Sequence, residues 1–420
     1  MSAPTARPVR GTRDLFGEVL RRHRRVVETA RSLALRYAFA EIETPILEFT
    51  DLFARSLGEG SDVVSKEMYS FTDRGGDSIT LRPEGTAAVV RAAMAGSLLQ
   101  LRPLKLFYHG PMFRYERPQK GRLRQFHQVG VEVLGAAEPA ADVECILMGR
   151  HLLEELGLGE AVVLELNSLG NLESRRRYRE VLVSYLRRRE GELSPESRVR
   201  LQRNPLRVLD SKDAGDRRVV AEAPRLTDHL DEESRRFFEE VCDRLDSLGV
   251  AYRINPHLVR GLDYYTHTAF EFTTDRLGAQ GAVLAGGRYD GLMAALGGPD
   301  LPGIGWAAGV ERLAMLLSEA PPAPRPLAVI PVGEEAEGEA WRLAQELRRA
   351  GFVVDLAYRG RAGQRMKRAD RLGCRFALSL GGDELARGTV RLRDLDSGEE
   401  REIARDELAD TLLGLGAERR

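Results

Sequence analysis

The sequence predicts an α/β protein of two or three domains, and three observations support this fold class. The chain has 420 residues, of which 43% are hydrophobic, and this is enough for more than one core. Two strand-like runs flank a basic loop between residues 113 and 133. After a proline-rich segment at 321–326, strand and helix patterns alternate as they do in a small α/β domain.

The N-terminal part predicts a helix, a strand and a second helix in that order. Residues 19–39 form an amphipathic helix pattern, because apolar residues recur at three- and four-residue steps and arginines fill the other face. The run at 41–48 reads as a strand, and Pro45 predicts that it lies at an edge or boundary, since proline cannot donate to a central ladder. Residues 84–86, Glu-Gly-Thr, then begin a helix, so a carboxylate and a hydroxyl are expected at its N-terminus.

The most informative segment is a predicted hairpin, with strands at 113–117 and 125–133 joined by a basic loop at 118–124. The second strand alternates with period 2. One of its faces needs a core and consists of Val129, Val131 and Val133. The opposite face consists of Phe126, Gln128 and Glu132. An amide and a carboxylate beside an Arg/Lys-rich loop favour a polyanionic ligand such as a nucleotide or RNA. On this segment alone, an exposed and salt-bridged hairpin is the alternative.

Two later regions differ in composition from the rest. Residues 171–230 carry runs of arginine on helical patterns with few large apolar residues, and they predict an inserted helical module with a solvated charged face. Residues 325–420 predict an α/β domain, with strands at 327–332, 353–357 and 376–380 and a helix between each pair. The second helical region, 359–375, holds seven basic residues against Asp370 alone, which favours nucleic acid.

The bulk composition excludes several classes of protein. The 63 basic and 64 acidic residues give a net charge of −1, so an RNA contact must come from a local patch. Cys145, Cys242 and Cys374 form no C-x-x-C pair and the histidines show no metal-binding spacing, so no metal site of the Cys/His type is expected. The chain contains no P-loop motif. It also lacks an apolar leader and any run of 18 apolar residues, which predicts a cytoplasmic protein.

Three further segments carry residues suited to chemistry. Residues 258–265 combine an arginine, a carboxylate and two phenols. Residues 286–291 are glycine-rich, which lets a backbone approach a ligand closely. Residues 303–313 lead from a strand through small residues into a helix that carries Arg312. Each segment is a weak signal by itself.

Together these segments resemble the histidyl-tRNA synthetases, a family of class II aminoacyl-tRNA synthetases, over essentially the whole chain. Residues 10–14 match the start of that family, 41–53 look like class II motif 1, 104–135 like motif 2 and 303–316 like motif 3. Residues 258–265 and 286–291 look like its two histidine-specific signatures. The resemblance implies an antiparallel catalytic sheet flanked by helices, built from 1–170 and 231–320. It also implies a helical insertion domain at 171–230, an anticodon-binding domain at 325–420, and a homodimer formed through motif 1.

The resemblance also implies an activity and a set of site residues. The chain would activate L-histidine with ATP to histidyl-adenylate and transfer histidine to the 3′ end of tRNA(His), with Mg²⁺ bridging the β- and γ-phosphates. The implied catalytic residues are Arg114, Arg260 and Arg312. The implied ATP-binding residues are Arg114, Glu116, Arg122, Phe126 and Arg312, with adenine stacked between Phe126 and Arg312. The implied histidine-binding residues are Glu84, Gly85, Thr86, Arg114, Gln128, Glu132, Arg260, Tyr264, Tyr265 and Tyr289.

The chemistry of adenylate formation agrees with these residue types. A carboxylate must attack the α-phosphorus, and the two anions repel each other. Guanidinium groups at Arg114 and Arg260 would neutralise the charge that concentrates in the transition state. The step needs no general base, which fits a sequence without a Ser-His or His-Asp arrangement.

Two alternatives come from the same fold. One is a non-catalytic paralogue that binds histidine and regulates ATP phosphoribosyltransferase in histidine biosynthesis; such a protein is expected to lack the 325–420 domain and to have lost catalytic arginines. The other is a class II synthetase for a different amino acid. Tyr264, Tyr265 and Glu132 argue against the second alternative, because phenols and a carboxylate offer partners to an imidazole.

Overall fold

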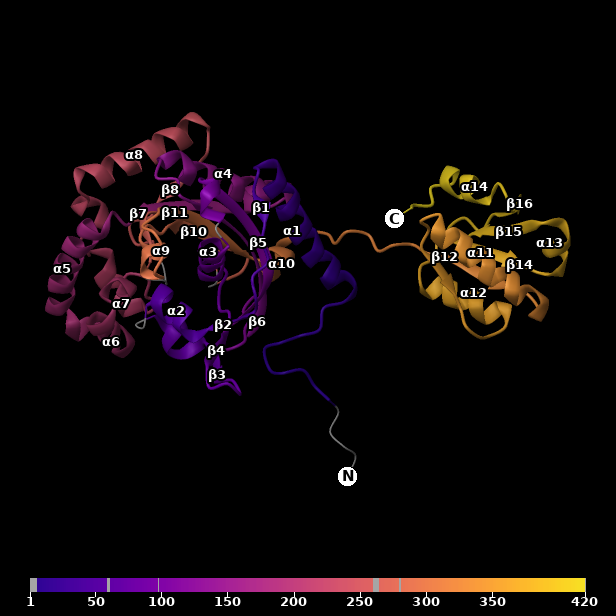
Figure 1. Cartoon of the computed structure of the whole chain (residues 1–420), viewed down its shortest axis with the longest axis horizontal. Coiled ribbons are helices and arrows are strands. Elements are labelled where there is room, and N and C mark those ends of the chain that lie inside the picture. The colour runs from indigo at the N-terminus through magenta and orange to yellow at the C-terminus, as the bar shows by residue number, and fades with distance from the viewer. Residues whose placement is uncertain (1–5, 59–60, 97, 260–263, 279–280, 420) are drawn as a thin grey trace, which may run out of the picture. The chain divides into compact units, whose positions relative to one another are not determined.

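The structure, a computed structural model, describes residues 6–58, 61–96, 98–259, 264–278 and 281–419 (Figure 1). The chain divides into two compact units, Met1–Pro321 and Pro322–Arg420. We call them the N-terminal unit and the C-terminal unit and describe each by itself. None of the helices in the described part of the chain is long and apolar enough to cross a membrane.

A large, mostly antiparallel sheet organises the N-terminal unit. Its strand order is β1-β5-β6-β11-β10-β9-β7-β8, and β1 with β5 and β7 with β8 are its parallel pairs. The strands are β1 (Ala40–Glu41), β5 (Leu104–Phe113), β6 (Gln125–Leu134), β7 (Val163–Ser168), β8 (Arg253–Ile254), β9 (Thr266–Thr273), β10 (Ala282–Arg288) and β11 (Gly303–Gly309). The hairpin of β5 and β6 therefore lies against β11, although more than 160 residues separate β6 from β11 in the sequence.

Helices cover both faces of this sheet. The helices on one face are α1 (Gly17–Arg36), α4 (Pro139–Glu155), α8 (Glu232–Ser247) and α10 (Val310–Leu316). Their core includes Val129, Val131 and Val133, which confirms the predicted valine face. On the other side, α3 (Thr86–Ala95) and α9 (Leu292–Ala295) pack on β5, and α2 (Thr50–Leu57) lies beside them. A small sheet follows in the order β2 (Leu47–Phe49), β4 (Ser78–Leu81) and β3 (Tyr69–Thr72).

Two predicted strands are corrected by the structure. The predicted strand at 113–117 is wrong, because β5 ends at Phe113. The sequence of β5 contains Gly110 and Pro111, and both residue types are unfavourable within a strand. The sequence therefore did not predict a strand before Phe113. The single strand predicted at 41–48 is also wrong, because two short strands, β1 and β2, replace it. Both are edge strands, of different sheets, which confirms the boundary position indicated by Pro45.

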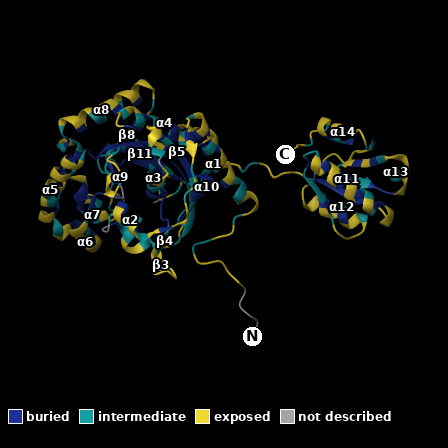
Figure 2. Cartoon of the chain, in the orientation of Figure 1, coloured by how far each residue is buried: buried dark blue, intermediate teal, exposed yellow. Residues whose placement is uncertain are grey.

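Residues 172–229 fold into α5 (Leu172–Arg188), α6 (Pro195–Arg203), α7 (Ala214–Ala221) and short helical turns. Polar side chains cap the three helices: Asn171 accepts a hydrogen bond from the Ser174 amide at 2.9 Å, and Ser194 and Asp213 act in the same way. Their inner faces are buried (Figure 2). The core that they form also includes Tyr265 and Ala269, which lie just before and within β9. The helices are therefore packed on one side and carry most of their arginines on the other.

The C-terminal unit is a five-stranded sheet covered by helices. Its order is β13-β12-β14-β15-β16, with β12 parallel to both β13 and β14. Its strands are β12 (Leu327–Pro331), β13 (Val354–Leu356), β14 (Phe376–Leu380), β15 (Thr389–Asp394) and β16 (Glu400–Ala404). Its helices are α11 (Glu337–Arg349), α12 (Ala362–Arg371), α13 (Gly382–Arg387) and α14 (Leu408–Gly414). The predicted alternation from 327 to 380 is confirmed, and the β15–β16 hairpin is an addition.

Several arginines of the basic stretch 359–375 form ion pairs, so the stretch carries less uncompensated positive charge than its sequence indicates. Arg365 pairs with Glu337, Arg368 pairs with Asp355 at 2.9 Å, and Arg375 pairs with Asp394 and Asp396. These carboxylates come from other segments of the fold. A count along the sequence, which found Asp370 alone, could not include them.

Candidate active site

A cavity lies on the face of the large sheet that is opposite the valine core. Strands β6, β9, β10 and β11 contribute to its lining, together with α3, α10 and the loop between β5 and β6. Most of the site residues expected from the sequence line it: Glu84, Thr86, Arg114, Glu116, Arg122, Phe126, Gln128, Tyr264, Tyr265, Tyr289 and Arg312. Gly85 and Glu132 are described but do not line the cavity, and Arg260 lies outside the described residues.

Arginines gather in one part of the cavity. The Arg114 guanidinium carbon lies 5.4 Å from the centre of the Phe126 ring, and its Nε donates to the Pro83 carbonyl at 2.9 Å. The Arg312 Nε donates to the carbonyl of Gly121, in the loop between β5 and β6, at 3.3 Å. Burial lowers the pKa of Arg312, and the nearby Arg122 and Arg114 lower it further. An anion placed among these groups would be bound tightly, because it relieves the mutual repulsion of the cations.

The other part of the cavity rests on buried carboxyl groups. Glu84 accepts hydrogen bonds from the amides of Thr86 and Ala87 at 2.7 and 2.8 Å, so it caps α3. The Thr86 hydroxyl donates to Glu132 Oε1 at 2.8 Å, and the Tyr289 hydroxyl donates to Glu132 Oε2. The placement of a carboxylate and a hydroxyl at a helix N-terminus is thus confirmed.

Glu132 is the most strongly perturbed carboxyl group of this cluster. Its residue is 1% exposed, and burial raises its pKa to about 8. The hydrogen bonds from Tyr289 and Thr86 act in the opposite direction but are outweighed. Glu132 lies directly beneath the lining, and both of its oxygens already accept hydrogen bonds from lining residues.

Aromatic rings and glycines shape the wall next to Glu132. The rings of Tyr264 and Tyr265 are 4.6 Å apart between centroids, and those of Tyr264 and Tyr289 are 5.7 Å apart. A Cβ atom on Gly305 would stand 1.9 Å from Glu132 Oε2, so only glycine fits there. Gly85 serves packing in the same way, because a Cβ atom on it would meet the Tyr108 ring at 2.2 Å.

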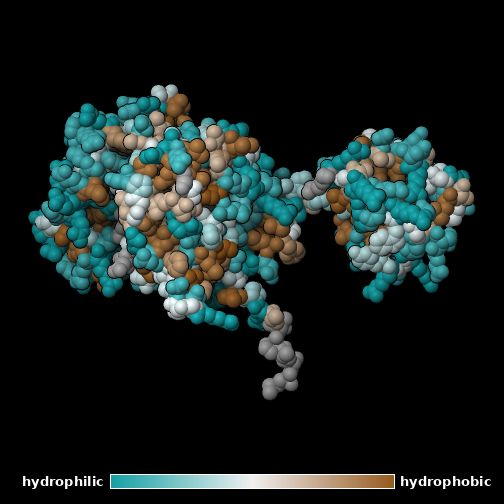
Figure 3. All heavy atoms as spheres, viewed as in Figure 1, coloured by the Kyte–Doolittle hydropathy of each residue, from teal (hydrophilic) through white to brown (hydrophobic). Residues whose placement is uncertain are grey.

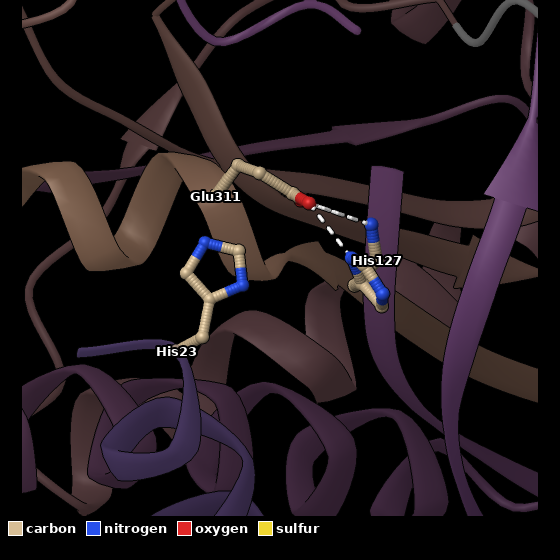
Figure 4. A group of neighbouring side chains, drawn as sticks. All are labelled: His23, His127 and Glu311. Carbon is tan, nitrogen blue, oxygen red and sulfur yellow. Dashed lines mark hydrogen bonds and ion pairs between the residues drawn. The ribbon is translucent and has the colours of Figure 1, made fainter. Parts of the chain in front are cut away.

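A second cluster adjoins the cavity, since its member Glu311 also lines the cavity, and it was not indicated by the sequence. Figure 4 shows Glu311 of α10 beside the His127 ring of β6, with the His23 ring of α1 next to them. Glu311 accepts hydrogen bonds from the His127 amide at 2.9 Å and from its ring Nδ1 at 2.8 Å. One ligand atom from each of the three residues lies within 4.8 Å of the others, so the group could hold a metal ion. Residues 23, 127 and 311 are too far apart in sequence for spacing to predict this group.

The clamp between Glu311 and His127 has a direct consequence for the cavity. Phe126 and Gln128, the neighbours of His127, line the cavity, and so does Arg312, the neighbour of Glu311. The buried carboxylate therefore fixes the helix that carries Arg312 to the strand that carries Phe126 and Gln128.

Glu271 of β9 is a further lining residue that sequence reasoning missed. A signal was present in the sequence. Glu271 stands between Phe270 and Phe272, two fully buried rings, so a strand through these residues turns Glu271 to the opposite face.

Comparison with known proteins identifies this arrangement. The family model for histidyl-tRNA synthetase matches residues 11–313, and that for the anticodon binding domain matches residues 327–415. The histidine–tRNA ligase of Rhodospirillum rubrum is 62% identical, over 94% of this chain and 96% of its own length. That of Gluconacetobacter diazotrophicus is 57% identical, over 97% and 98%.

A solved structure agrees. The apo histidyl-tRNA synthetase of S. aureus superposes with a TM-score of 0.81 at 38% identity and covers 97% of this chain and 99% of its own. The expected class II fold is thereby confirmed. The regulatory alternative is not supported, because it predicts the loss of a C-terminal domain that this chain has and that a family model matches. The chain belongs to the histidyl-tRNA synthetase family, and it is an enzyme of the aminoacyl-tRNA synthetase class, a histidine–tRNA ligase.

Proposed function

We propose that the cavity binds ATP among its arginines and L-histidine against its buried carboxyl groups, and that it joins them as histidyl-adenylate. One observation carries this division. Gln128 Oε1 is buried in the lining and has no hydrogen-bond partner among the described residues. A buried acceptor of this kind needs a donor, and the ammonium group of an amino acid supplies one. Glu84 and Thr86, which line the same part, offer further oxygens.

The triphosphate suits the arginine-rich part. Arg114, Arg122 and Arg312 are three cations in one lining, and Phe126 offers a ring on which adenine can stack. Glu116 pairs with Arg122 at 2.7 Å and so holds that guanidinium in place. Carboxylates of Glu116 and Glu271 in the lining are oxygen ligands that Mg²⁺ accepts. When bound, Mg²⁺ would neutralise charge on the β- and γ-phosphates.

The imidazole of histidine suits the tyrosine-rich part. Tyr264, Tyr265 and Tyr289 surround this end with ring faces and hydroxyls. Glu132 lies behind Tyr289 and Thr86, whose hydroxyls donate hydrogen bonds to it. It can therefore orient these hydroxyls toward the imidazole, or it can accept a hydrogen bond from the imidazole in place of one of them. A site built from such polar partners rejects apolar amino acids strongly, because they leave those partners without hydrogen bonds.

Adenylate formation then follows from charge neutralisation. A carboxylate oxygen of histidine attacks the α-phosphorus, the bond to the β-phosphate oxygen breaks, and pyrophosphate leaves with that electron pair. Arg114 neutralises the charge that concentrates at the α-phosphate, and no proton needs to be removed. Arg260 stays a predicted partner of the same phosphate. The aminoacyl group then passes to the 3′-terminal ribose of tRNA(His), and AMP is released.

We further propose that 1–170 with 231–320 form the catalytic domain, that 171–230 form an insertion domain and that 325–420 contact the anticodon. The helices of 171–230 reach the cavity wall, because Arg175 of α5 donates to the Tyr265 carbonyl at 3.0 Å. Contacts of that region with tRNA can thus bear on the histidine site. Because charged tRNA is consumed in translation, we place the enzyme in the cytoplasm.

A homodimer through the motif 1 segment is also proposed. Ile46, Leu47, Phe49 and Phe71 are exposed large hydrophobic residues around the small β2-β4-β3 sheet. Figure 3 shows hydrophobic residues gathered on the face of the N-terminal unit that carries α2 and β2. A patch of this kind is typical of an interface. Sedimentation of the wild type and of Phe49→Asp tests it: the variant is expected to be a monomer, and a monomeric wild type would exclude the dimer.

Paired binding measurements test the division of the cavity. Glu132→Gln is expected to weaken histidine about 10- to 100-fold and to leave ATP within about 2-fold, since it alters only the imidazole end. Glu116→Gln, at the other end, is expected to weaken ATP and to spare histidine. If either substitution weakened both ligands equally, the two ends would not divide the substrates as proposed.

A further inference from the structure

A turn that precedes α1 lies against the loop between β5 and β6. The described residues 6–16 form neither helix nor strand, and the chain turns at residues 9–12, which we call the Gly11 turn. The amide and the hydroxyl of Thr12 both donate to the Val9 carbonyl, at 2.9 and 2.7 Å, and Gly11 has a φ of +86°. The Gly11 turn is thus closed by its own hydrogen bonds, and the Gly11 carbonyl remains for a partner elsewhere.

The Gly11 carbonyl begins a series of backbone hydrogen bonds that leads to a cavity arginine. It accepts a hydrogen bond from the Arg124 amide at 2.8 Å. The Arg124 carbonyl in turn accepts one from the Arg114 amide at 2.9 Å. Arg114 lines the cavity, and so does Phe126, two residues after Arg124. Two hydrogen bonds therefore connect the Gly11 turn to the backbone of the residue that we expect at the α-phosphate.

The Arg124 side chain strengthens this connection. A Cβ atom on Gly11 would stand 2.7 Å from Cγ and 3.0 Å from Cδ of Arg124, so this side chain lies directly on the turn. Its guanidinium carbon is 3.9 Å from the centre of the Tyr115 ring, and its Nε donates to the Glu116 carbonyl at 3.3 Å. Arg124 stands at the end of the loop, and Tyr115 and Glu116 stand at its start. The Gly11 turn is thus packed on the residue that holds the two ends of the loop together.

Neither the cavity nor the core accounts for the Gly11 turn. Residues 9–12 are all described, and none of them lines the cavity or belongs to a hydrophobic core of the N-terminal unit. Gly11 also has no side chain that could reach a ligand. An effect of the turn on a ligand must therefore pass through Arg124 and the loop.

We propose that the Gly11 turn is a positioning element for ATP, because it holds the loop at 114–124 in the form that binds the nucleotide. A loop that is ordered before binding spends less of the binding energy on its own ordering. With the turn in place, Arg114 can meet the phosphates and Phe126 the adenine without a prior rearrangement of the loop. The inference rests on the proposed ATP site among the arginines, and it adds a segment that acts on this site from outside the cavity.

Two glycine substitutions in the full-length enzyme test the proposal. Gly11→Ala forces a side chain against Arg124 and strains a backbone of positive φ. Gly17→Ala is the matched control, because Gly17 also has a positive φ, +58°, but a Cβ atom on it would meet nothing within 4 Å. In histidine-dependent ATP–pyrophosphate exchange, Gly11→Ala is expected to raise the KM for ATP about 10-fold and to leave that for histidine within about 2-fold. Gly17→Ala should change neither KM by more than about 2-fold.

Two more variants separate loop positioning from a general loss of stability. In Gly11→Ala/Arg124→Ala the new Cβ atom no longer meets Cγ and Cδ of Arg124, so the KM for ATP should return toward that of Arg124→Ala alone. A protein that was merely unstable would not recover when a second side chain is removed. Thr12→Val keeps the shape of its side chain and removes only the hydroxyl hydrogen bond that closes the turn. It should raise the KM for ATP about 2- to 5-fold, and it decides by itself if Gly11→Ala does not fold.

Each outcome decides the proposal. An unchanged KM for ATP in Gly11→Ala and Thr12→Val, or an equal rise in the KM of both substrates, would refute the positioning role. A double variant no better than Gly11→Ala would refute it too, because Arg124 would then not connect the turn to the loop. Arg312→Ala is measured alongside. If it impairs exchange while the turn variants do not, the proposed ATP site stands and only the positioning role is refuted. If Arg312→Ala leaves exchange unchanged, the proposed ATP site fails, whatever the turn variants show.

Discussion

The cavity of the N-terminal unit and the surface of the C-terminal unit use arginine in opposite ways. In the cavity, backbone carbonyls of Pro83 and Gly121 hold Arg114 and Arg312, and Arg312 stands close enough to Arg122 and Arg114 for the three cations to disfavour one another's charge at Arg312. On the C-terminal surface, carboxylates from other segments meet most of the arginines, as Asp355 meets Arg368. The comparison shows that the number of basic residues in a segment says little about its function, whereas the partners that the fold supplies say much.

The physical reason is the surrounding medium. An exposed ion pair is screened by water and salt and contributes little to stability. A group of cations held together in a partly buried cavity raises the local potential and favours an incoming anion. Preorganised charge of this kind requires no rearrangement during the reaction, which is why it accelerates phosphoryl chemistry.

Removal of the C-terminal unit is expected to have the largest effect on the overall reaction. A fragment that ends at Ala320 keeps the whole cavity, so it should still form histidyl-adenylate. Charging of tRNA should fall by about 10²–10⁴. Two linked domains that bind one tRNA hold it more tightly than either domain alone, and the fragment loses this gain in affinity. Both activities are measured on the same preparation. Undiminished charging would show that the C-terminal unit does not contact tRNA productively.

Substitution of a cavity arginine comes next in size. Arg312→Ala should lower the rate of adenylate formation by about 10²–10³, because it removes a charge placed for the transition state. The same range is expected for Arg260→Ala. Arg368→Ala, from the C-terminal surface, is the matched control and should leave the rate unchanged. Rapid-quench measurement of adenylate formation is the readout, and a similar rate for the cavity and surface variants would remove the contrast between the two regions.

The smallest effect concerns stability and pH. Glu132 has a pKa of about 8 in the folded protein against 4.5 for an ordinary glutamate. Between these values the folded state binds one more proton than the unfolded state, so stability falls as pH rises from about 4.5 to about 8. Glu132→Gln removes this dependence and should gain roughly 3 kcal/mol over the wild type between pH 5 and pH 8.

Denaturant unfolding of the two proteins at several pH values measures this difference. Glu418→Gln, an exposed carboxylate in the C-terminal unit, serves as the control and should show no such trend. A constant difference between Glu132→Gln and the wild type across this range would mean that Glu132 is ionised in the folded protein throughout.

Local patterns in the sequence were sufficient for part of the fold. The period-2 alternation of Val129, Val131 and Val133 predicted a buried face, and the alternation after residue 321 predicted the first five elements of the C-terminal unit. The position of Pro45 predicted an edge correctly. Most of the site residues that the sequence motifs indicate line the cavity.

The remainder depends on contacts between distant segments. The strand at 104–113 was missed because Gly110 and Pro111 weaken its local signal, and pairing with the distant β1 as well as with β6 stabilises it. The clamp between His127 and Glu311 joins residues 184 positions apart. The hydrogen bonds from Thr86 and Tyr289 to Glu132 likewise join residues that are far apart in the sequence. No local pattern contains these pairings.

ATP–pyrophosphate exchange with each of the twenty amino acids tests the central claim most directly, because it reads the chemistry of the cavity without tRNA. The arrangement of Gln128, Glu132 and the three tyrosines predicts exchange with histidine and with essentially no other amino acid. Comparable exchange with a second amino acid, or none with histidine, would contradict the assignment of the cavity.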